Sequence, residues 1–567
     1  MKITGARIVV ECLAEQGVDT VFGYPGGTIL NIYDELYKHS DRITHILTAH
    51  EQGASHAADG YARATGNVGV VLATSGPGST NLVTGIATAY MDSVPVVAIT
   101  CNVATNLLGK DSFQEVDIAG ITMSITKHNY IVRDVKDLAD TIREAFAIAR
   151  TGRPGPVLID IPKNVTAEVA EWEPAGNPDN RDLPADIISR RLSGKIPAVT
   201  EADIEKAVAI LSRSKRPLFY AGGGVVISDS GEELKQLAEK LNAPVTVSLM
   251  GKTAFPSRHP LCTGMIGMHG TKASNAAANK CDLLVAIGAR FSDRVISDPA
   301  RFAQESSVLQ IDIDPAEINK NIRTEACLNG DIKQILSALV SRVPERPRDE
   351  WNNLVDEWKT HIPAMYTKKT SLHPKFVLET VHEKLGDDTI ITTEVGQHQM
   401  WVAQFYPFSK PRTLLTSGGL GTMGYGTGAA IGAQKAFPDR NVVHIAGDGS
   451  FRMNLNELAT ISHYNLPIII IVANNGTLGM VRQWQKLFYD KRYSQTTLDR
   501  PPDFVKLAEA FSIRGYRAAN EAEFIKAFDS ALSERKPALI DCYMDIDEMV
   551  FPMVPAGKPI DELLLDA

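Results

Sequence analysis

The chain has 567 residues and a net charge of −9 at pH 7, because 67 acidic residues outnumber 58 lysines and arginines. This length predicts about three or four domains, each large enough to bury its own core. No cluster of lysine and arginine suggests a nucleic-acid partner. No apolar run approaches the ~20 residues that span a bilayer, so we expect no membrane partner either.

The cysteines and the N-terminus indicate a cellular compartment. Six cysteines are scattered along the sequence without Cys-x-x-Cys spacing, which is typical of reduced core residues rather than of disulfides or a metal site. Residues 1–16 are amphipathic and contain Glu11 and Glu15, so they do not form a secretory signal. We therefore expect a cytoplasmic protein of enzyme size.

The first segment, residues 1–170, contains repeated strand-turn-helix passes. Apolar runs at 20–22, 45–47 and 68–73 each lead into a turn and then a helical pattern. Strands that alternate with helices predict a parallel, doubly wound sheet. Glu51 lies between the second run and a helix of small residues. A first-turn glutamate accounts for Glu51 without any ligand, whereas the small residues beside it would also admit another surface.

The middle segment, residues 190–340, follows a stretch at 173–197 whose Pro, Asp, Asn and Arg content predicts a linker. Runs at 217–221, 244–249, 282–287 and 308–313 predict another α/β domain. The triplet Gly222-Gly223-Gly224 could approach a phosphate but is not Gly-x-Gly-x-x-Gly, so it is a weak signal. Asp312 could accept a hydrogen bond from a ribose hydroxyl, or it could be a turn residue before Pro315.

The last segment is predicted to be a third α/β domain at 370–550 with a short tail at 551–567 that could close over a site. A strand at 390–392 leads to Gln397 and His398, whose side chains could meet phosphate oxygens, although a lone histidine is more often structural. Residues 417–426 are unusually rich in glycine, which permits close approach of the backbone to a ligand.

Two polar motifs in this segment predict a metal site. An apolar run at 442–446 ends in Gly447-Asp448-Gly449, and a second at 467–473 ends in Asn474-Asn475-Gly476. A helical pattern between them predicts parallel strands, so Asp448 and Asn475 lie just past carboxyl ends, where open α/β sheets bind ligands. Each motif alone is usually a turn. Together they predict a Mg²⁺ that bridges protein oxygens to a diphosphate.

The order of the motifs resembles the thiamine-diphosphate enzymes of the pyruvate decarboxylase and acetolactate synthase group. The resemblance rests on residues 24–27, 50–52 and 74–81, followed by the paired motifs at 447–449 and 474–475. Residues 109–115, 151–156, 264–270, 288–294 and 480–485 are similar to the catalytic large subunits of acetolactate (acetohydroxyacid) synthases. The family implies an α/β fold of three doubly wound parallel-sheet domains: pyrimidine-binding, central FAD-binding and diphosphate-binding.

The resemblance implies the cofactors thiamine diphosphate, Mg²⁺ and FAD. Glu51 would hydrogen-bond the aminopyrimidine ring and so favour the imino tautomer that removes the thiazolium proton. Met423 would hold the cofactor bent. The implied metal ligands are Asp448, Asn475 and the main-chain carbonyl of Thr477. The residues implied to contact thiamine diphosphate are Pro25, Gly26, Glu51, Thr74, Asn81, Gln397, His398, Met423, Gly447, Gly449, Ser450, Leu478, Gly479 and Met480.

The resemblance also implies FAD and substrate residues. Gln114 and Arg294 would act with Glu51 in catalysis, and Arg294 would clamp the carboxylate of the second 2-oxo acid. Without the resemblance, Arg294 is a surface arginine. Asn164 and Ser292 stand where the family usually has Asp. The implied FAD contacts are Arg153, Gly222, Gly223, Gly224, Leu249, Met265, Met268, His269, Gly288, Arg290, Asp312, Ile313 and Asp331, and the implied substrate pocket is Gly27, Phe113, Lys163, Arg294, Met480, Val481 and Trp484.

By this resemblance the chain decarboxylates pyruvate and transfers the hydroxyethyl unit to a second pyruvate or to 2-oxobutyrate, the first common step of valine, leucine and isoleucine biosynthesis. The alternative is another enzyme of this cofactor group, such as a pyruvate oxidase or decarboxylase. A nicotinamide dehydrogenase is disfavoured by the missing Gly-x-Gly-x-x-Gly. The family places Glu51 and Asp448 of one active site on different subunits, which implies a homodimer or homotetramer and leaves a small regulatory subunit open.

Overall fold

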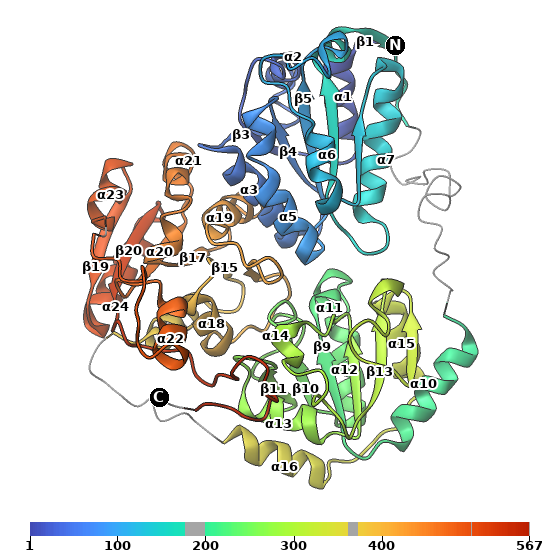
Figure 1. Cartoon of the computed structure of the whole chain (residues 1–567), viewed down its shortest axis with the longest axis vertical. Coiled ribbons are helices and arrows are strands. Elements are labelled where there is room, and N and C mark those ends of the chain that lie inside the picture. The colour runs from blue at the N-terminus through green and yellow to red at the C-terminus, as the bar shows by residue number, and fades with distance from the viewer. Residues whose placement is uncertain (176–198, 361–371, 501, 566–567) are drawn as a thin grey trace.

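The computed structural model describes residues 1–175, 199–360, 372–500 and 502–565. Within these ranges the chain folds around three sheets, each of six parallel strands with helices packed on its faces (Figure 1). This confirms the predicted α/β class with three parallel sheets. The linker predicted at 173–197 lies mostly outside the described residues. Among the described helices, none is long and apolar enough to cross a membrane.

The N-terminal sheet has the strand order β3-β2-β4-β5-β7-β6. Every residue of β4, β5 and β7 is buried, because helices cover both faces. The strands are β2 (Thr20–Gly23), β3 (Thr44–Leu47), β4 (Gly69–Ala73), β5 (Val96–Asn102), β6 (His128–Ile131) and β7 (Val157–Pro162), and an antiparallel pair joins β1 (Lys2–Thr4) to β8 (Val169–Glu171). The helices are α1 (Gly5–Glu15), α2 (Leu30–Lys38), α3 (Glu51–Thr65), α4 (Pro77–Thr80), α5 (Val83–Asp92), α6 (Ile118–Thr122), α7 (Leu138–Arg150) and α8 (Lys163–Ala167).

The central sheet has the order β11-β10-β9-β12-β13-β14 and its own apolar core. Its strands are β9 (Pro217–Ala221), β10 (Val245–Val247), β11 (Cys262–Met265), β12 (Leu283–Ile287), β13 (Ser307–Asp312) and β14 (Ala326–Asn329). The helices are α10 (Glu201–Arg213), α11 (Gly223–Ile227), α12 (Gly231–Leu241), α13 (Lys272–Lys280), α14 (Asp293–Ile296), α15 (Ile332–Arg342) and α16 (Glu350–Lys359).

The C-terminal sheet has the order β16-β15-β17-β18-β20-β19. Its strands are β15 (Ile390–Thr393), β16 (Leu414–Leu415), β17 (Val442–Gly447), β18 (Ile469–Asn474), β19 (Arg514–Ala518) and β20 (Ala538–Tyr543). The helices are α17 (Pro374–Leu385), α18 (Gln397–Phe405), α19 (Gly426–Ala436), α20 (Asp448–Phe451), α21 (Leu458–His463), α22 (Gly479–Phe488), α23 (Phe504–Ala510) and α24 (Glu521–Glu534).

Helices α3 and α19 lie side by side and join the N-terminal and C-terminal domains (Figure 1). Small residues let their backbones meet. A Cβ atom added to Gly60 would lie 2.4 Å from the carbonyl oxygen of Ala429, and one added to Gly432 would lie 1.9 Å from that of Ala57. One apolar cluster includes residues of both domains, from Phe22 to Leu539. The two domains therefore share a core, which fixes the position of α3.

The tail after β20 crosses from the C-terminal to the central domain, as the dark red trace in Figure 1 shows. The main-chain N–H of Val554 donates to the carbonyl of Met268 at 2.7 Å, and the Asn275 amide donates to the carbonyl of Ile560 at 2.8 Å. Met268 also packs with Phe551 in a small apolar cluster. The described part of the tail is therefore packed against the rest of the chain.

Candidate functional site

The paired motifs of the C-terminal domain lie together at one edge of its sheet. Strands β17 and β18 pair in parallel with Gly447 opposite Ala473, so Asp448 and Asn475 follow neighbouring carboxyl ends. The side chain of Asp448 is buried, and its Oδ2 atom has no hydrogen-bond partner among the described residues. Burial raises the pKa of Asp448 to about 7, against the lowering effects of Arg452 and of main-chain amides that include Gly476. A buried carboxylate oxygen of this kind would be completed by a cation.

The neighbouring groups that could bind a metal present hard oxygen atoms. Asn475 donates through its Nδ2 to the Oε1 atom of Gln397 at 3.1 Å, which leaves its amide oxygen for another ligand. The hydroxyl of Thr477 donates to the carbonyl of Thr496 at 2.8 Å and so fixes the backbone of Thr477. Within the described ranges no group of three His, Cys, Asp and Glu residues could hold a metal. One carboxylate, one amide and one carbonyl, with phosphate oxygens and water, fit Mg²⁺ instead.

Gln397 and His398 begin α18 beside these candidate metal ligands. The Gln397 amide donates to Oε1 of Gln483 at 3.1 Å and to the carbonyl of Glu548 at 2.9 Å. His398 is buried, and its Nε2 has no partner among the described residues. Burial lowers the pKa of His398 to about 3, so the ring is neutral at pH 7. A Cβ atom on Gly447 would lie 2.7 Å from Nδ1 of His398, so only glycine permits this packing.

The N-terminal domain holds the second group of predicted residues at its own strand ends. Glu51 is the first residue of α3 and is 8% exposed. The cap of α3 is His50, whose ring accepts from the main-chain N–H of Gln52 at 3.0 Å. The Glu51 carboxylate instead accepts from the Asn81 amide at 2.9 Å. Thr74 lies against Gly26, where an added Cβ would come within 2.5 Å of its side chain. The three N-terminal motifs therefore meet around Glu51.

Glu457, which the sequence does not single out, contacts the second group from the C-terminal domain. It lies in a 3₁₀ turn, Leu455–Glu457, of the C-terminal domain and is fully buried. Its carboxylate accepts from the main-chain N–H groups of Ala49 at 3.2 Å and His50 at 3.0 Å. A Cβ atom on Gly53 would overlap the Glu457 side chain. Burial raises the pKa of Glu457. The turn that presents Glu51 is thus held by the other domain.

Residues predicted for the acceptor substrate gather at a third place. The guanidinium carbon of Arg294 lies 5.8 Å from the ring centre of Trp484, and its Nη1 contacts Sδ of Met268 at 3.5 Å. The tail packs on Met268 and Trp484 through Phe551 and its neighbours. Arg294, from the central domain, and Trp484, from the C-terminal domain, therefore lie in contact across the two domains, although the Arg294 side chain is 61% exposed.

Three other predicted substrate residues are exposed on the surface of this single chain. Phe113 is 87% exposed and Val481 is 50% exposed. Lys163, at the start of α8, is also exposed. Gln114 adopts a φ of 59°, and its backbone packs on Gly76. Met480 is partly buried and packs on the C-terminal core.

The predicted FAD residues lie at the carboxyl ends of the central strands. Asp312 ends β13, and burial raises its pKa to about 6. Its Oδ1 accepts from the main-chain N–H of Asp314 at 2.9 Å. Gly222 and Gly224 pack directly on the backbone of Gly288, where added Cβ atoms would come within 2.1 and 2.6 Å. These glycines are therefore explained by close packing of two loops, whether or not a phosphate lies beside them.

Two further predicted FAD residues have partners of their own. Arg153 forms ion pairs with Asp314 at 3.2 Å and with Glu317 at 2.9 Å. Asp331 caps α15 by accepting from the main-chain N–H of Gln334 at 2.8 Å. The pair of Arg153 with Asp314 and Glu317 joins the N-terminal domain to the central domain.

Comparison with known families assigns the three parts of the chain. Residues 3–121 match the N-terminal TPP binding domain of thiamine pyrophosphate enzymes, another name for thiamine-diphosphate enzymes. Residues 204–339 match the central domain of these enzymes. Residues 394–542 match their C-terminal TPP binding domain.

Individual relatives extend the match over nearly the whole chain. The chain is 47% identical to the probable acetolactate synthase large subunit of Methanocaldococcus jannaschii, over 99% of this chain and 95% of that protein. It is 46% identical to the acetolactate synthase large subunit of Pyropia yezoensis, over 98% and 94%. It is also 46% identical to that of Corynebacterium glutamicum, over 98% and 89%. The chain therefore belongs to the thiamine pyrophosphate enzymes and, within them, to the family of acetolactate synthase large subunits.

Proposed function

We propose that this chain decarboxylates pyruvate on thiamine diphosphate and transfers the two-carbon unit to a second 2-oxo acid. Pyruvate as acceptor gives 2-acetolactate, and 2-oxobutyrate gives 2-aceto-2-hydroxybutyrate. The observation that carries the proposal is the buried, unpartnered oxygen of Asp448 beside Asn475 at neighbouring strand ends. The names of the relatives favour this reaction over a pyruvate oxidase or a simple decarboxylase.

Each group of residues has a role in this proposal. Bound thiamine diphosphate would supply the carbon nucleophile and accept electrons as carbon dioxide leaves. Asp448, Asn475 and Thr477 would hold Mg²⁺ against its diphosphate, because these oxygens suit a hard cation. Glu51, which is buried at the start of α3, would hold a proton at the pyrimidine ring. Its hydrogen bond from Asn81 keeps the carboxylate in one orientation.

Arg294 and Trp484 would bind the acceptor. A guanidinium forms two parallel hydrogen bonds to a carboxylate, which suits the carboxylate of a 2-oxo acid. Trp484 lies beside the guanidinium, and the tail residues around Phe551 pack against Trp484 and Met268. Apolar side chains here would exclude water, and this would protect a reactive carbon from protonation before the acceptor arrives. Gln114 is proposed to complete the catalytic set.

FAD is part of the proposal as a bound but redox-silent group. Asp312 fits the adenosine end, because its buried carboxylate stands at a strand end where a ribose hydroxyl could donate. We also propose a division into domains at 1–170, 190–340 and 370–550, with the tail at 551–567. All six cysteines are free thiols, which supports a reducing compartment such as the cytoplasm.

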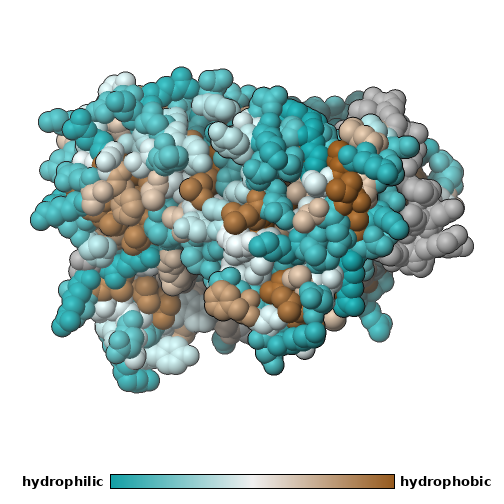
Figure 2. Space-filling view, turned by 90° about the horizontal axis from the view of Figure 1, so that it is seen from above, coloured by the Kyte–Doolittle hydropathy of each residue, from teal (hydrophilic) through white to brown (hydrophobic). Residues whose placement is uncertain are grey.

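A second copy of the chain would complete the site. Large apolar side chains are exposed on the N-terminal domain, at Phe113 and Met123, and on the C-terminal domain, at Met453 and Val481. Figure 2 shows several separate apolar patches among hydrophilic residues on one face of the molecule. A contiguous apolar patch on a protein surface often marks a contact with a partner. We propose a homodimer or homotetramer, and the name large subunit leaves room for a small regulatory subunit. Light scattering of the purified protein tests this, and a strict monomer would contradict it.

The experiment for the reaction itself is product analysis. The purified chain is incubated with pyruvate, with thiamine diphosphate, Mg²⁺ and FAD each left out in turn. We expect 2-acetolactate as the main product and its loss without thiamine diphosphate or Mg²⁺. Acetaldehyde or acetate as the main product would refute the transfer step and leave the cofactor site standing.

A further inference from the structure

A glycine-rich loop carries the residue proposed to shape the cofactor. Residues 417–425, here called the Met423 loop, connect β16 to α19. Gly421 and Gly424 adopt φ angles of 72° and 89°, which L-residues rarely adopt. Glycine also leaves a chain many alternative conformations. Met423 has an apolar side chain and cannot fix its own position through hydrogen bonds, so its position depends on what holds the backbone on either side.

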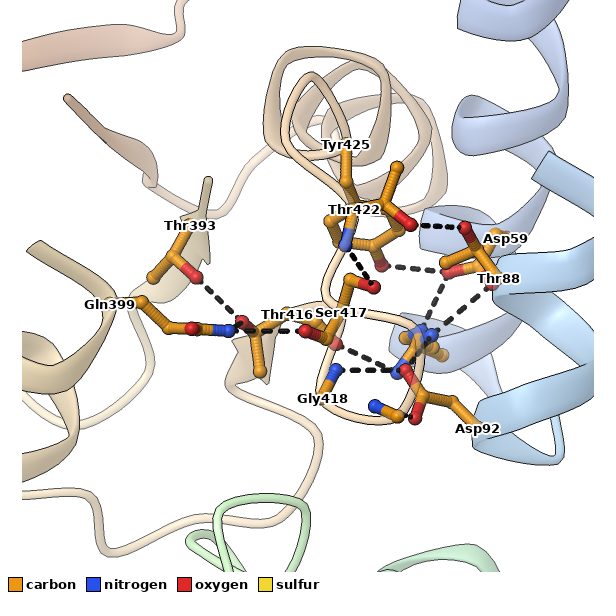
Figure 3. Close-up of polar contacts among 12 residues, drawn as sticks. Asp59, Thr88, Asp92, Thr393, Gln399, Thr416, Ser417, Gly418, Thr422 and Tyr425 are labelled. Atoms are coloured by element: carbon orange, nitrogen blue, oxygen red, sulfur yellow. Dashed lines mark hydrogen bonds and ion pairs between the residues drawn. The ribbon is translucent and has the colours of Figure 1, made fainter. Parts of the chain in front are cut away.

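Asp92 holds the first part of this loop from the other domain. It is the last residue of α5, in the N-terminal domain, and it is 7% exposed. Its carboxylate accepts from the main-chain N–H groups of Gly418 at 3.0 Å and Gly419 at 2.7 Å (Figure 3). A Cβ atom on Gly419 would lie 2.7 Å from this carboxylate, so glycine is required for the approach.

Arg63 balances the charge of Asp92 and adds contacts of its own. Its Nη2 donates to Asp92 at 2.9 Å, and its Nε donates to Asp59 at 2.6 Å. Its Nη1 donates to the carbonyl of Thr416, directly before the loop, at 3.0 Å. Asp59 in turn accepts from the hydroxyl of Tyr425, the last residue of the loop, at 2.7 Å (Figure 3). One arginine thus connects both ends of the Met423 loop to α3 and α5.

Glu394 holds the second part of the loop from within the C-terminal domain. It follows β15 and is fully buried. Its carboxylate accepts from the main-chain N–H groups of Gly424 at 2.5 Å, Gly426 at 3.0 Å and Thr427 at 3.3 Å. The ring of His444 lies beside it, with its Nε2 atom 3.5 Å from Oε1 of Glu394. The backbone on each side of Met423 is therefore bound by a buried carboxylate.

We propose that Asp92, with Arg63, and Glu394 are positioning residues that fix the Met423 loop in the shape that holds the cofactor bent. This inference rests on the proposed function. Buried charges are costly and stabilise a fold less than apolar packing would, whereas a reacting group must be held within about 0.5 Å of its productive position. The carboxylates of Asp92 and Glu394 bind main-chain amides on either side of Met423. This arrangement fixes the position of Met423 more than it stabilises the fold.

The first test measures the loop without any cofactor. Amide hydrogen exchange is followed in the apo-protein for Asp92→Asn and Glu394→Gln. We expect faster exchange at Gly418 and Gly419 in the first variant, and at residues 424–427 in the second. The matched control is Asp282→Asn. Asp282 accepts two main-chain N–H groups, from Lys215 at 2.8 Å and Arg216 at 3.0 Å, in the central domain. This control should leave the Met423 loop unchanged.

The second test measures the bent cofactor directly. Exchange of the thiazolium C2 proton of bound thiamine diphosphate with deuterium is timed in the absence of pyruvate, and cofactor affinity is measured by calorimetry. We expect at least about tenfold slower C2 exchange in Asp92→Asn, because a displacement of about 1 Å can cost a hundredfold in rate. Affinity should change less than about threefold, because the metal and diphosphate residues are untouched.

A milder variant covers the case in which Asp92→Asn does not fold. Thr422→Val removes the hydroxyl contact between Thr422 and Thr88, 2.8 Å between Oγ1 atoms, and leaves the charges in place. It should slow C2 exchange by a smaller factor. Unchanged loop protection, or a loosened loop with unchanged C2 exchange, would overturn the inference. If the wild-type chain formed no acetolactate, the proposed function would fail instead. Hydrogen exchange would still show whether Asp92 and Glu394 hold the Met423 loop.

Discussion

Gly60 packs on the backbone of Ala429 where α3 meets α19, and its replacement by alanine tests how α3 is held. The new Cβ atom would lie 2.4 Å from the Ala429 carbonyl oxygen and 2.5 Å from its Cα. Carbon atoms in contact are normally about 3.5–4.0 Å apart, so the helices would have to separate by about 1 Å. Both atoms belong to the backbone, so no side chain can rotate away.

The expected cost follows from two opposing terms. In an exposed helix Gly→Ala stabilises by about 1 kcal/mol. Overpacking a core costs roughly 1–3 kcal/mol and sometimes more, and here the separation also disturbs the contacts of Gly432 with Ala57 along the same interface. We therefore expect Gly60→Ala to lower the free energy of unfolding by about 1–2 kcal/mol net. A shift of α3 by about 1 Å also displaces Glu51, so turnover should fall by up to about a hundredfold.

Urea unfolding, followed by hydrogen exchange in α3, is the assay, because a chain of three domains need not unfold in one step. Gly27→Ala is the control for stability. Gly27 has no atom within 4 Å of an added Cβ, so its variant should stay within about 0.5 kcal/mol of wild type. A Gly60→Ala chain that is as stable as wild type, or more stable, would refute the packing argument.

Three more variants test the metal site, a buried carboxyl group and the acceptor site. In wild type, Mg²⁺ should increase the affinity for thiamine diphosphate at least about tenfold by calorimetry, and Asp448→Asn should abolish this increase. An unchanged Mg²⁺ dependence in the variant would contradict the metal site. Burial raises the pKa of Asp160 from 3.8 to about 6, so the folded state binds its proton more tightly and loses stability as pH rises from about 4 to 6. The unfolding free energy of wild type minus that of Asp160→Asn should fall by up to about 3 kcal/mol over this window. If the unfolding free energies of the two proteins changed in parallel with pH, the raised pKa of Asp160 would be refuted. Arg294→Ala should raise the pyruvate concentration needed for acetolactate formation by about tenfold or more, because it removes a charge-assisted hydrogen bond. It should also shift the product towards acetaldehyde. An unchanged product ratio would show that Arg294 does not bind the acceptor.

The three sheets and the pairing of Asp448 with Asn475 could be predicted from the sequence, because both depend on local patterns. Continuous apolar runs bounded by turns identify buried parallel strands. Parallel strands then bring their carboxyl ends to one edge whatever the rest of the chain does. The observed register, with Gly447 opposite Ala473, places the two motifs together for this reason.

The residues that hold the site in place could not be predicted in the same way. Asp92, Arg63 and Glu457 occur in or near helices, where charged residues usually face solvent. The amides that Asp92 binds lie more than 300 positions along the chain, and those that Glu457 binds lie more than 400 positions away. No local pattern records such a partner. Conversely, Gly222 and Gly224 suggested a phosphate loop, while their packing on Gly288 already accounts for them.

The proposed carboligase depends on Glu51 to activate its cofactor. Acetolactate formation from pyruvate by wild type and Glu51→Gln, with all cofactors present, measures this dependence. The substitution keeps the shape of the side chain and its contact with Asn81 but removes the carboxylate. We expect cofactor-dependent acetolactate from wild type and a rate at least about a hundredfold lower in the variant, in the range typical of lost acid–base catalysis. Equal rates in the two proteins would contradict the proposed role of Glu51 in activating the cofactor.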